Sequence, residues 1–359
     1  MFVALRDLRF ARGRFALISG VVALITLLVG FLSGLTGGLA LQNVSAVLAL
    51  PADRLVFSSP SDGASTASFT DSAVTAEQID AWSSAEGVDS AQPLGISQGR
   101  AENGSKRAAV AVFGVPVGFD DAAPARSGLV TLSEGAADEL GAVAGDTVSV
   151  GGAAYQVDRV TPDAWYSHTP VVTVTLDDWQ AQTTAPGAGA GVTATATVLA
   201  VTGDPDWTAV ARTTGTVSES TLGSVRAIGS FTSEIGSLLM MVAMLFGISA
   251  LVIGAFFTVW TMQRQGDVAV LKALGASTRS LVRDSLGQAL VVLVIGIGVG
   301  IGLVSVLGAL AGSALPFVLS PLTTVLPGVV MIALGLAGAA VALRAVTSAD
   351  PLTALGGNR

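Results

Sequence analysis

The chain has 359 residues, of which 51% are hydrophobic and 12% charged, and its formal net charge is −8. Such an apolar composition indicates a membrane protein rather than an average soluble one. The chain lacks cysteine, which excludes disulfides and thiolate chemistry, and it lacks the GxxxxGK[ST], HExxH and Cys/His patterns of nucleotide and metal sites. We therefore predict no catalytic site and no cofactor bound by this chain itself.

Four charge-poor apolar stretches are long enough to cross a bilayer, which takes about 20 helical residues. They are Phe15–Ala40, Ile235–Met262, Leu286–Leu310 and Val325–Val346. The predicted fold is a multi-pass membrane protein with four transmembrane α-helices and a large mixed α/β extracytoplasmic domain between helices 1 and 2. The predicted segments are 1–14 (cytoplasmic), 15–40 (first span), 41–232 (extracytoplasmic domain), 233–262 (second span), 263–284 (cytoplasmic coupling segment), 285–312 (third span), 313–324 (outer turn), 325–346 (fourth span) and 347–359 (cytoplasmic tail).

The charge distribution predicts the orientation of these spans. Residues 41–232 hold 21 Asp and Glu against 8 Lys and Arg, a net of −13, whereas the rest of the chain holds 10 basic and 5 acidic residues. Because basic residues favour the cytoplasmic side, both termini and the coupling segment are predicted to lie inside and the large domain outside. The Arg-rich start also fits a cleaved signal peptide, but its apolar run is longer than usual and no small-x-small site follows.

Alternating apolar and polar residues predict strands in the large domain, and capping side chains predict helices. Helices are expected to begin at Thr75, Ser133 and near Asp206, and Gly151-Gly152 is expected to turn a hairpin. Strands separated by short helices and closed on themselves are favoured over a doubly wound sheet. The predicted strands are Arg54–Ser58, Ala108–Val117, Thr147–Val150, Tyr155–Val160, Val171–Leu176 and Thr193–Val201.

Glycine and proline mark the last two spans. Gly298 and Gly302 form a GxxxG pattern, which is either a close-packing face, within the subunit or across a dimer, or a pair that a membrane span simply tolerates. Pro316, Pro321 and Pro327 are expected to end the helices around the outer turn.

Two polar residues outside the cytoplasm are candidates for ligand binding. Glu234 begins the second span and shares a helical face with Met241 and Met244. Two interpretations are open. In one, this face binds an amphiphilic or metal-bearing ligand. In the other, Glu234 is a solvated residue that the helix macrodipole favours, and the methionines pack against neighbouring residues. The single histidine, His168, is expected to be an ordinary packed or surface residue, with ligand binding as the alternative.

The coupling segment is more elaborate than a loop between two spans requires. Val268, Leu271 and Leu274 lie at i, i+3 and i+6, which predicts one apolar stripe of a short helix. Gly275 is expected to end this helix with a positive φ, and Ser277 to cap the next helix. A rigid helix–turn–helix of this kind can transmit force from a cytoplasmic partner into two spans.

The run RQGDVAVLKALGASTRSLVRD resembles the cytoplasmic motif of FtsX-like permeases of ABC transporters, and RAVTSADPLTAL (Arg344–Leu355) is similar to that family's C-terminal end. The family usually has Glu where this chain has Asp267. The resemblance implies a homodimer in the lipid bilayer of the cell membrane, served by two copies of a separate ATPase that binds ATP and Mg, and no nucleic acid. It places the ATPase contact on Asp267, Val268, Leu271, Lys272, Leu274, Gly275, Ala276 and Ser277.

Two further runs, RDLRFARGRFALISGVVALITLLVGFLSGLTGGL and GSFTSEIGSLLMM, resemble the haem-exporting branch of the family. This likeness implies haem as substrate near Glu234, Met241 and Met244, with Arg226 meeting the propionates. Two alternatives remain open at this point. The first is a signal-transmitting permease that regulates a cell-wall hydrolase, and the second is an exporter of peptides, lipids or lipoproteins.

Overall fold

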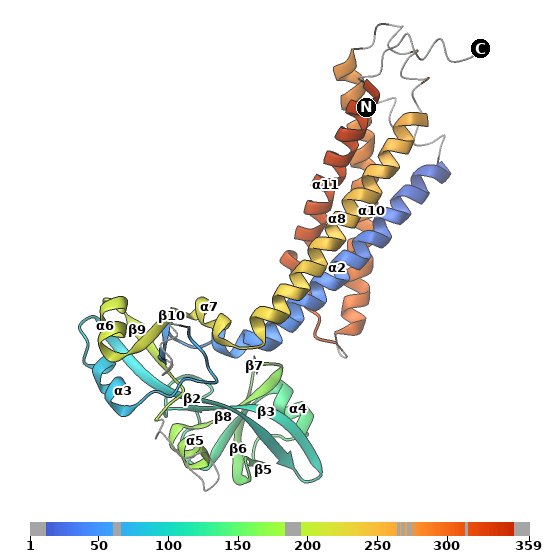
Figure 1. Ribbon diagram of the computed structural model, residues 1–359. Helices are drawn as coiled ribbons and strands as arrows, with labels where there is room; N and C mark the ends of the chain where they lie inside the picture. The colour runs from blue at the N-terminus through green and yellow to red at the C-terminus, as the bar shows by residue number, and fades with distance from the viewer. Residues whose placement is uncertain are drawn as a thin grey trace. The chain divides into compact units, whose positions relative to one another are not determined.

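A computed structural model describes residues 12–59, 66–183, 195–263, 277–312 and 315–347, together with 266, 270 and 275. Contacts divide the chain into two compact units, Met1–Gly38 with Gly236–Arg359 and Leu39–Ile235. The first unit is helical and the second is a mixed α/β unit, as the ribbon in Figure 1 shows. Four apolar helices of spanning length, with the α/β unit between the first two in sequence, confirm the predicted fold class.

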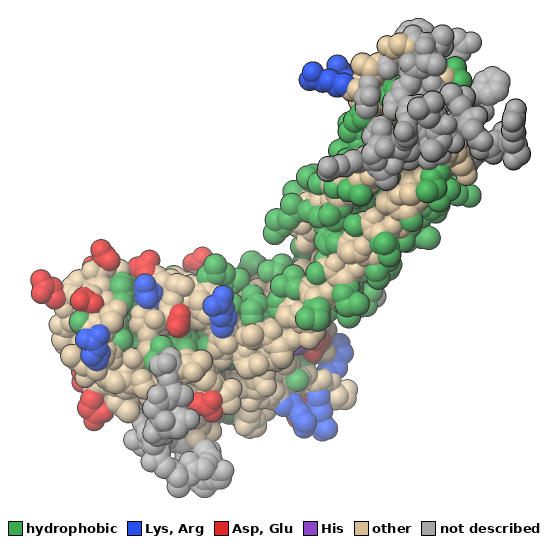
Figure 2. Space-filling model, turned by 45° about the horizontal axis from the view of Figure 1, so that its top comes forward, with side chains coloured by type: hydrophobic (Ala, Val, Ile, Leu, Met, Phe, Trp, Pro, Cys, Tyr) green, Lys and Arg blue, Asp and Glu red, His purple; other side chains and the backbone are tan. Residues whose placement is uncertain are grey.

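The four spanning helices are α2 (Arg12–Leu48), α8 (Phe231–Gln263), α10 (Thr278–Ala311) and α11 (Pro321–Thr347). Their buried faces meet in an apolar core that includes Val22, Leu293 and Met331. The outward faces are apolar as well, and Figure 2 shows hydrophobic side chains along the visible surface of these helices. This is expected where lipid rather than water is the solvent.

The third span packs through a different glycine pair from the predicted one. A Cβ at Gly300 would lie 2.5 Å from Thr26 Cβ, and one at Gly296 would lie 2.8 Å from the Ser19 carbonyl oxygen. These two glycines let α10 approach α2 closely. In contrast, a Cβ at Gly298 or Gly302 would have no atom within 4 Å among the described residues. The predicted packing face is therefore not used in the described part of the subunit, since helical periodicity turns it away from α2.

Proline in the fourth span differs from expectation at one position. Pro321 is the first residue of α11, where its missing N–H has no intrahelical role, so the helix begins four residues before the predicted span. Pro327 was expected to end a helix and instead lies inside α11. The prediction was wrong at Pro327 because a membrane helix close to its N-terminus tolerates the loss of one backbone hydrogen bond.

In the described part of the second unit, ten strands form one sheet in the order β10-β1-β9-β2-β3-β8-β4-β6-β5, with β7 paired to β8. The pairs β3–β8 and β4–β6 are parallel and the other pairs are antiparallel. The elements are β1 (Arg54–Ser58), α3 (Ala76–Ser83), β2 (Val88–Asn103), β3 (Lys106–Val115), β4 (Leu129–Ser133), α4 (Glu134–Leu140), β5 (Thr147–Val150), β6 (Ala153–Thr161), β7 (Trp165–Tyr166), β8 (Thr169–Thr175), α5 (Leu176–Thr183), β9 (Val198–Gly203), α6 (Trp207–Thr214), β10 (Thr216–Ser220), α7 (Thr221–Ser224) and the 3₁₀ turn η1 (Val225–Ala227).

The sheet closes on itself, as predicted. The last strand, β5, returns to β2 through the pairs Ala101↔Val150 and Glu102↔Ser149, so β2, β3, β8, β4, β6 and β5 form a ring. The long strand β2 also pairs with β9 and so carries the sheet on to β1 and β10. A register shift between Val88 and Ser90 bends β2 at its start.

The local predictions for this unit are confirmed where a side chain or a glycine determines the backbone. Thr75 forms a capping box with Gln78, and Ser133 and Asp206 accept backbone N–H bonds at the starts of α4 and α6. Gly151 and Gly152 have φ of 60° and 88° in the β5–β6 turn. All five residues of β4 are buried, although its sequence, LVTLS, alternates apolar and polar residues from Val130 to Ser133, and this strand is missing from the predicted ones.

Candidate functional site

The β7–β8 hairpin binds the C-terminal part of α2 through backbone groups. Its two turn residues, Ser167 and His168, have φ of 49° and 63° and donate N–H bonds to the carbonyls of Asn43 and Gln42, both 3.0 Å long. The Ser45 hydroxyl accepts the N–H of Trp165 at 2.9 Å. Two consecutive residues with positive φ match a type I′ turn, which normally contains glycine or asparagine. The hairpin therefore holds a strained histidine in a defined position.

The strained turn brings His168 to Glu234. The distance from His168 Nε2 to Glu234 Oε2 is 2.7 Å, and Asn43 Nδ2 donates to the same oxygen at 3.2 Å. These three residues, from α2, the β7–β8 turn and the start of α8, all belong to the second unit. We call them the Asn43–His168–Glu234 cluster. It is the one cluster in the described residues that joins a histidine to a carboxylate.

The cluster is partly buried and incompletely satisfied. Asn43 is fully buried, and the side chains of His168 and Glu234 retain 32% and 30% of their exposure. The amide oxygen of Asn43 is buried without a hydrogen-bond partner among the described residues. A buried, unpaired amide oxygen is costly, so the site can accept a further hydrogen-bond donor or an electrophile.

Three aromatic side chains pack together at the hairpin. Tyr166 packs edge-on against Phe69 and Phe113, with ring centroids 5.6 and 5.8 Å away. Burial raises the pKa of the Tyr166 phenol far above its usual range, so this side chain stays neutral. The reactive groups of the site are therefore the carboxylate, the imidazole and the amide.

These contacts revise two expectations from the sequence. Glu234 is not a fully solvated helix residue, because two side chains hold its carboxylate. His168, expected to be an ordinary residue, contributes directly to the cluster. Arg226 is exposed, and no hydrogen bond or ion pair between it and Glu234 occurs among the described residues. Met241 and Met244 belong to the first unit, where 50% and 64% of their surface is exposed.

Most of the coupling segment lies outside the described residues. This holds for Asp267, Val268, Leu271, Lys272, Leu274 and Ala276, whose predicted role stays a prediction. The two described positions agree with the predicted turn. Gly275 has φ of +94°, and the Ser277 hydroxyl accepts the Ser280 N–H as the N-cap of α10. The positive φ at Gly275 and the new helix start at Ser277 are thus as the sequence predicts.

Sequence reasoning missed Asn43 and underrated His168. The sequence around each of these two residues offers one weak indication of a functional position. Asn43 is a polar residue only three positions after the predicted end of the first span, and His168 follows Ser167 in a short polar break between aromatic and apolar residues. Neither signal says that the two positions meet, because they are 125 residues apart in the chain.

Comparison with known proteins identifies the C-terminal part of the chain. Residues 239–351 match the family described as FtsX-like permease C-terminal. A hemin transport system permease protein HrtB from Staphylococcus epidermidis is 23% identical over 365 aligned residues, which cover 100% of both chains. A second HrtB, from Staphylococcus haemolyticus, is 34% identical over 130 residues, which cover 36% of this chain and 37% of that one. An ABC transporter permease of Mycobacterium tuberculosis is 26% identical over 75% of both chains.

Proposed function

We propose that this chain, a permease of the FtsX-like family of ABC transporters, is the membrane subunit of an ATP-driven efflux system whose cargo is haem or a similar amphiphile. The observation that carries the proposal is the Asn43–His168–Glu234 cluster. Imidazole and carboxylate are both suitable ligands for iron, and haem offers iron together with an apolar ring. The proposed substrate is thus a flat amphiphile bearing an electrophilic centre.

The chemistry of three residues that the sequence groups with Glu234 supports this cargo. Arg226 is exposed and has a guanidinium that suits a propionate carboxylate. The exposed thioethers Met241 and Met244 offer soft, polarisable contacts for an apolar ring. HrtB relatives from two Staphylococcus species carry hemin transport in their names, which points to the same substrate class.

The proposed partners are a second copy of this chain and two copies of an ABC-type ATPase in the cell membrane, with both termini inside. In the most apolar 18-residue stretch of α8, 11% of the residues are buried, whereas 33% are buried in the corresponding stretch of each of the other three spans. Residues such as Met240 and Leu251 expose 68% and 73% of their surface. The second span therefore has the most surface left for another subunit. The turn at Gly275 and the capped start at Ser277 suit a rigid contact for the ATPase.

A spectral titration tests the haem site. Purified full-length protein in detergent is titrated with haem, and the Soret band is followed for the wild type, Glu234→Ala and His168→Ala. We expect both variants to weaken haem binding by about tenfold, since each removes one polar contact worth roughly 1.5 kcal/mol. Glu134→Ala is the matched control, because Glu134 also occupies the first turn of a helix but is exposed. Soret shifts identical to the wild type in both variants would remove the cluster from the haem site.

A growth experiment tests the activity itself. A strain that lacks this permease and its ATPase should become more sensitive to haem, and the wild-type gene should restore resistance. Growth on haem that is unchanged by the deletion would contradict haem export and favour the regulatory or lipid-export alternatives.

A further inference from the structure

A second candidate site lies in the α/β unit, and its lining shares no residue with the cluster. A partly open cavity of about 90 Å³ is lined by the end of α2, the strands β3, β4, β6 and β8, and the loop that follows β3. Exposed Ala49 and half-buried Asp120 and Thr161 are among its walls, so the cavity reaches the surface. Its lining comprises Ala46, Ala49, Leu50, Phe113, Val115, Asp120, Ala122, Ser133, Thr161, Ala164, Val171 and Thr173.

One carboxylate faces a lining that is otherwise apolar or hydroxyl-bearing. Asp120 accepts the N–H of Ala122 at 2.9 Å, which anchors one oxygen. Burial raises the pKa of the Asp120 carboxyl, and nearby Asp121 raises it further. No ion pair to Asp120 occurs in the described part of the chain. Partial burial of a carboxylate without a counterion costs free energy, and a bound cation would offset that cost.

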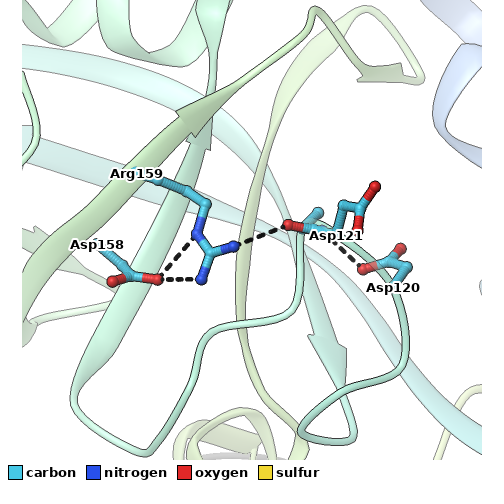
Figure 3. Close-up of polar contacts among 5 residues, drawn as sticks. Asp120, Asp121, Asp158 and Arg159 are labelled. Carbon is cyan, nitrogen blue, oxygen red and sulfur yellow. Dashed lines mark hydrogen bonds and ion pairs between the residues drawn. The ribbon is translucent and has the colours of Figure 1, made fainter.

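Arg159, the basic side chain drawn with Asp120 in Figure 3, already has partners. Figure 3 shows Arg159 directed to Asp158 and to the backbone of Asp121, not to Asp120. Its guanidinium bonds the Asp158 carboxylate at 2.9 and 2.7 Å and the Asp121 carbonyl at 3.3 Å. Arg159 therefore does not balance the charge of Asp120, and the described residues offer no other ion pair to it.

Other features of the cavity favour a cation too. The last turn of α2, which ends at Leu48, contributes Ala46 to the lining, and Ala49 and Leu50 follow it. The partial negative charge of a helix C-terminus attracts positive groups. Ser133, Thr161 and Thr173 supply hydroxyl oxygens that can accept N–H bonds.

We propose that this cavity binds a primary ammonium group on a short apolar stem, with Asp120 as its counterion. An ammonium group has three N–H donors, which suit one carboxylate and neighbouring hydroxyls. A divalent metal ion would need more oxygen ligands than one carboxylate provides. The volume suits about four non-hydrogen atoms, since a cavity of roughly 150 Å³ accommodates benzene. A free small amine and the end of a lysine side chain both meet this description, and neither depends on the proposed cargo.

Calorimetric titration of the full-length protein in amine-free detergent tests the proposal. Propylammonium is the probe, and propanol is the uncharged control of the same size. We expect one saturable site per chain for propylammonium and none for propanol. Asp120→Asn should weaken binding about tenfold or more, whereas Asp121→Asn, an exposed neighbour with the same change in charge, should not. Binding should also weaken as the pH falls, because protonation neutralises Asp120.

Further measurements complete the test. Thr173→Val keeps the shape of the side chain and leaves Asp120 in place, and it should weaken binding several-fold by removing one hydroxyl acceptor. Nα-acetyl-lysine amide distinguishes the sources, since tighter binding than propylammonium indicates a lysine side chain and weaker binding a free amine. Absence of saturable propylammonium binding to the wild type, or equal losses in Asp120→Asn and Asp121→Asn, would overturn the proposal.

Discussion

Replacing His168 separates the strain of its backbone from the contribution of its side chain. His168 has φ of 63°, a left-handed conformation that costs a residue with a Cβ about 1–2 kcal/mol. Its imidazole lies 2.7 Å from Glu234, and a hydrogen bond to a charged group contributes about 1.5–3 kcal/mol. Because the two side chains keep 32% and 30% of their exposure, solvent screening lowers this contribution to about 1–2 kcal/mol.

Two variants follow from these magnitudes. His168→Ala loses the hydrogen bond and keeps the strained backbone, so its free energy of unfolding should fall by about 1–2 kcal/mol. His168→Gly loses the same bond but relieves the strain, so it should be about 1 kcal/mol more stable than His168→Ala. Haem binding should be equally weak in both, because both lack the imidazole.

The assay is chemical unfolding of the full-length protein in detergent, followed by tryptophan fluorescence, with Trp165 close to the turn. If His168→Gly is no more stable than His168→Ala, the turn is not strained in the way that its φ angles indicate. If His168→Ala is as stable as the wild type, the contact with Glu234 does not stabilise the fold.

Three further changes test other parts of the structure. Gly300→Val should destabilise the helical unit by about 1–3 kcal/mol through overpacking, whereas Gly298→Val should leave the unfolding of the monomer unchanged, and thermal unfolding in detergent compares them. Asp120→Asn should be more stable than the wild type at neutral pH. The raised pKa of Asp120 makes the wild type lose stability as the pH rises above about 3.8, so the difference should vanish below that pH. Asp121→Asn should show no such difference. Gly275→Pro should uncouple ATP hydrolysis from transport in reconstituted vesicles, since proline is restricted to negative φ and Gly275 has +94°, and unchanged transport would contradict the coupling role.

Local features of the fold were predictable where one residue determines the backbone. The caps at Thr75, Ser133 and Asp206 and the Gly151-Gly152 turn depend on side-chain oxygens or on freedom at positive φ, both of which are readable from residue type. The four spans follow from length and hydropathy in the same way. Pro327 shows the limit of such rules, because its helix continues through it.

The sequence by itself determined a four-helix membrane protein with an α/β unit between the first two spans and no P-loop of its own, because apolar length, charge and motifs are local properties of a chain. Only the tertiary structure decided that Asn43, His168 and Glu234 meet, and that Asp120 faces a cavity without a counterion among the described residues. It also decided that α2 packs against Gly296 and Gly300 rather than against Gly298 and Gly302. The physical reason is the same in each case: a contact depends on how distant elements pack, and no periodicity within one element encodes its neighbour.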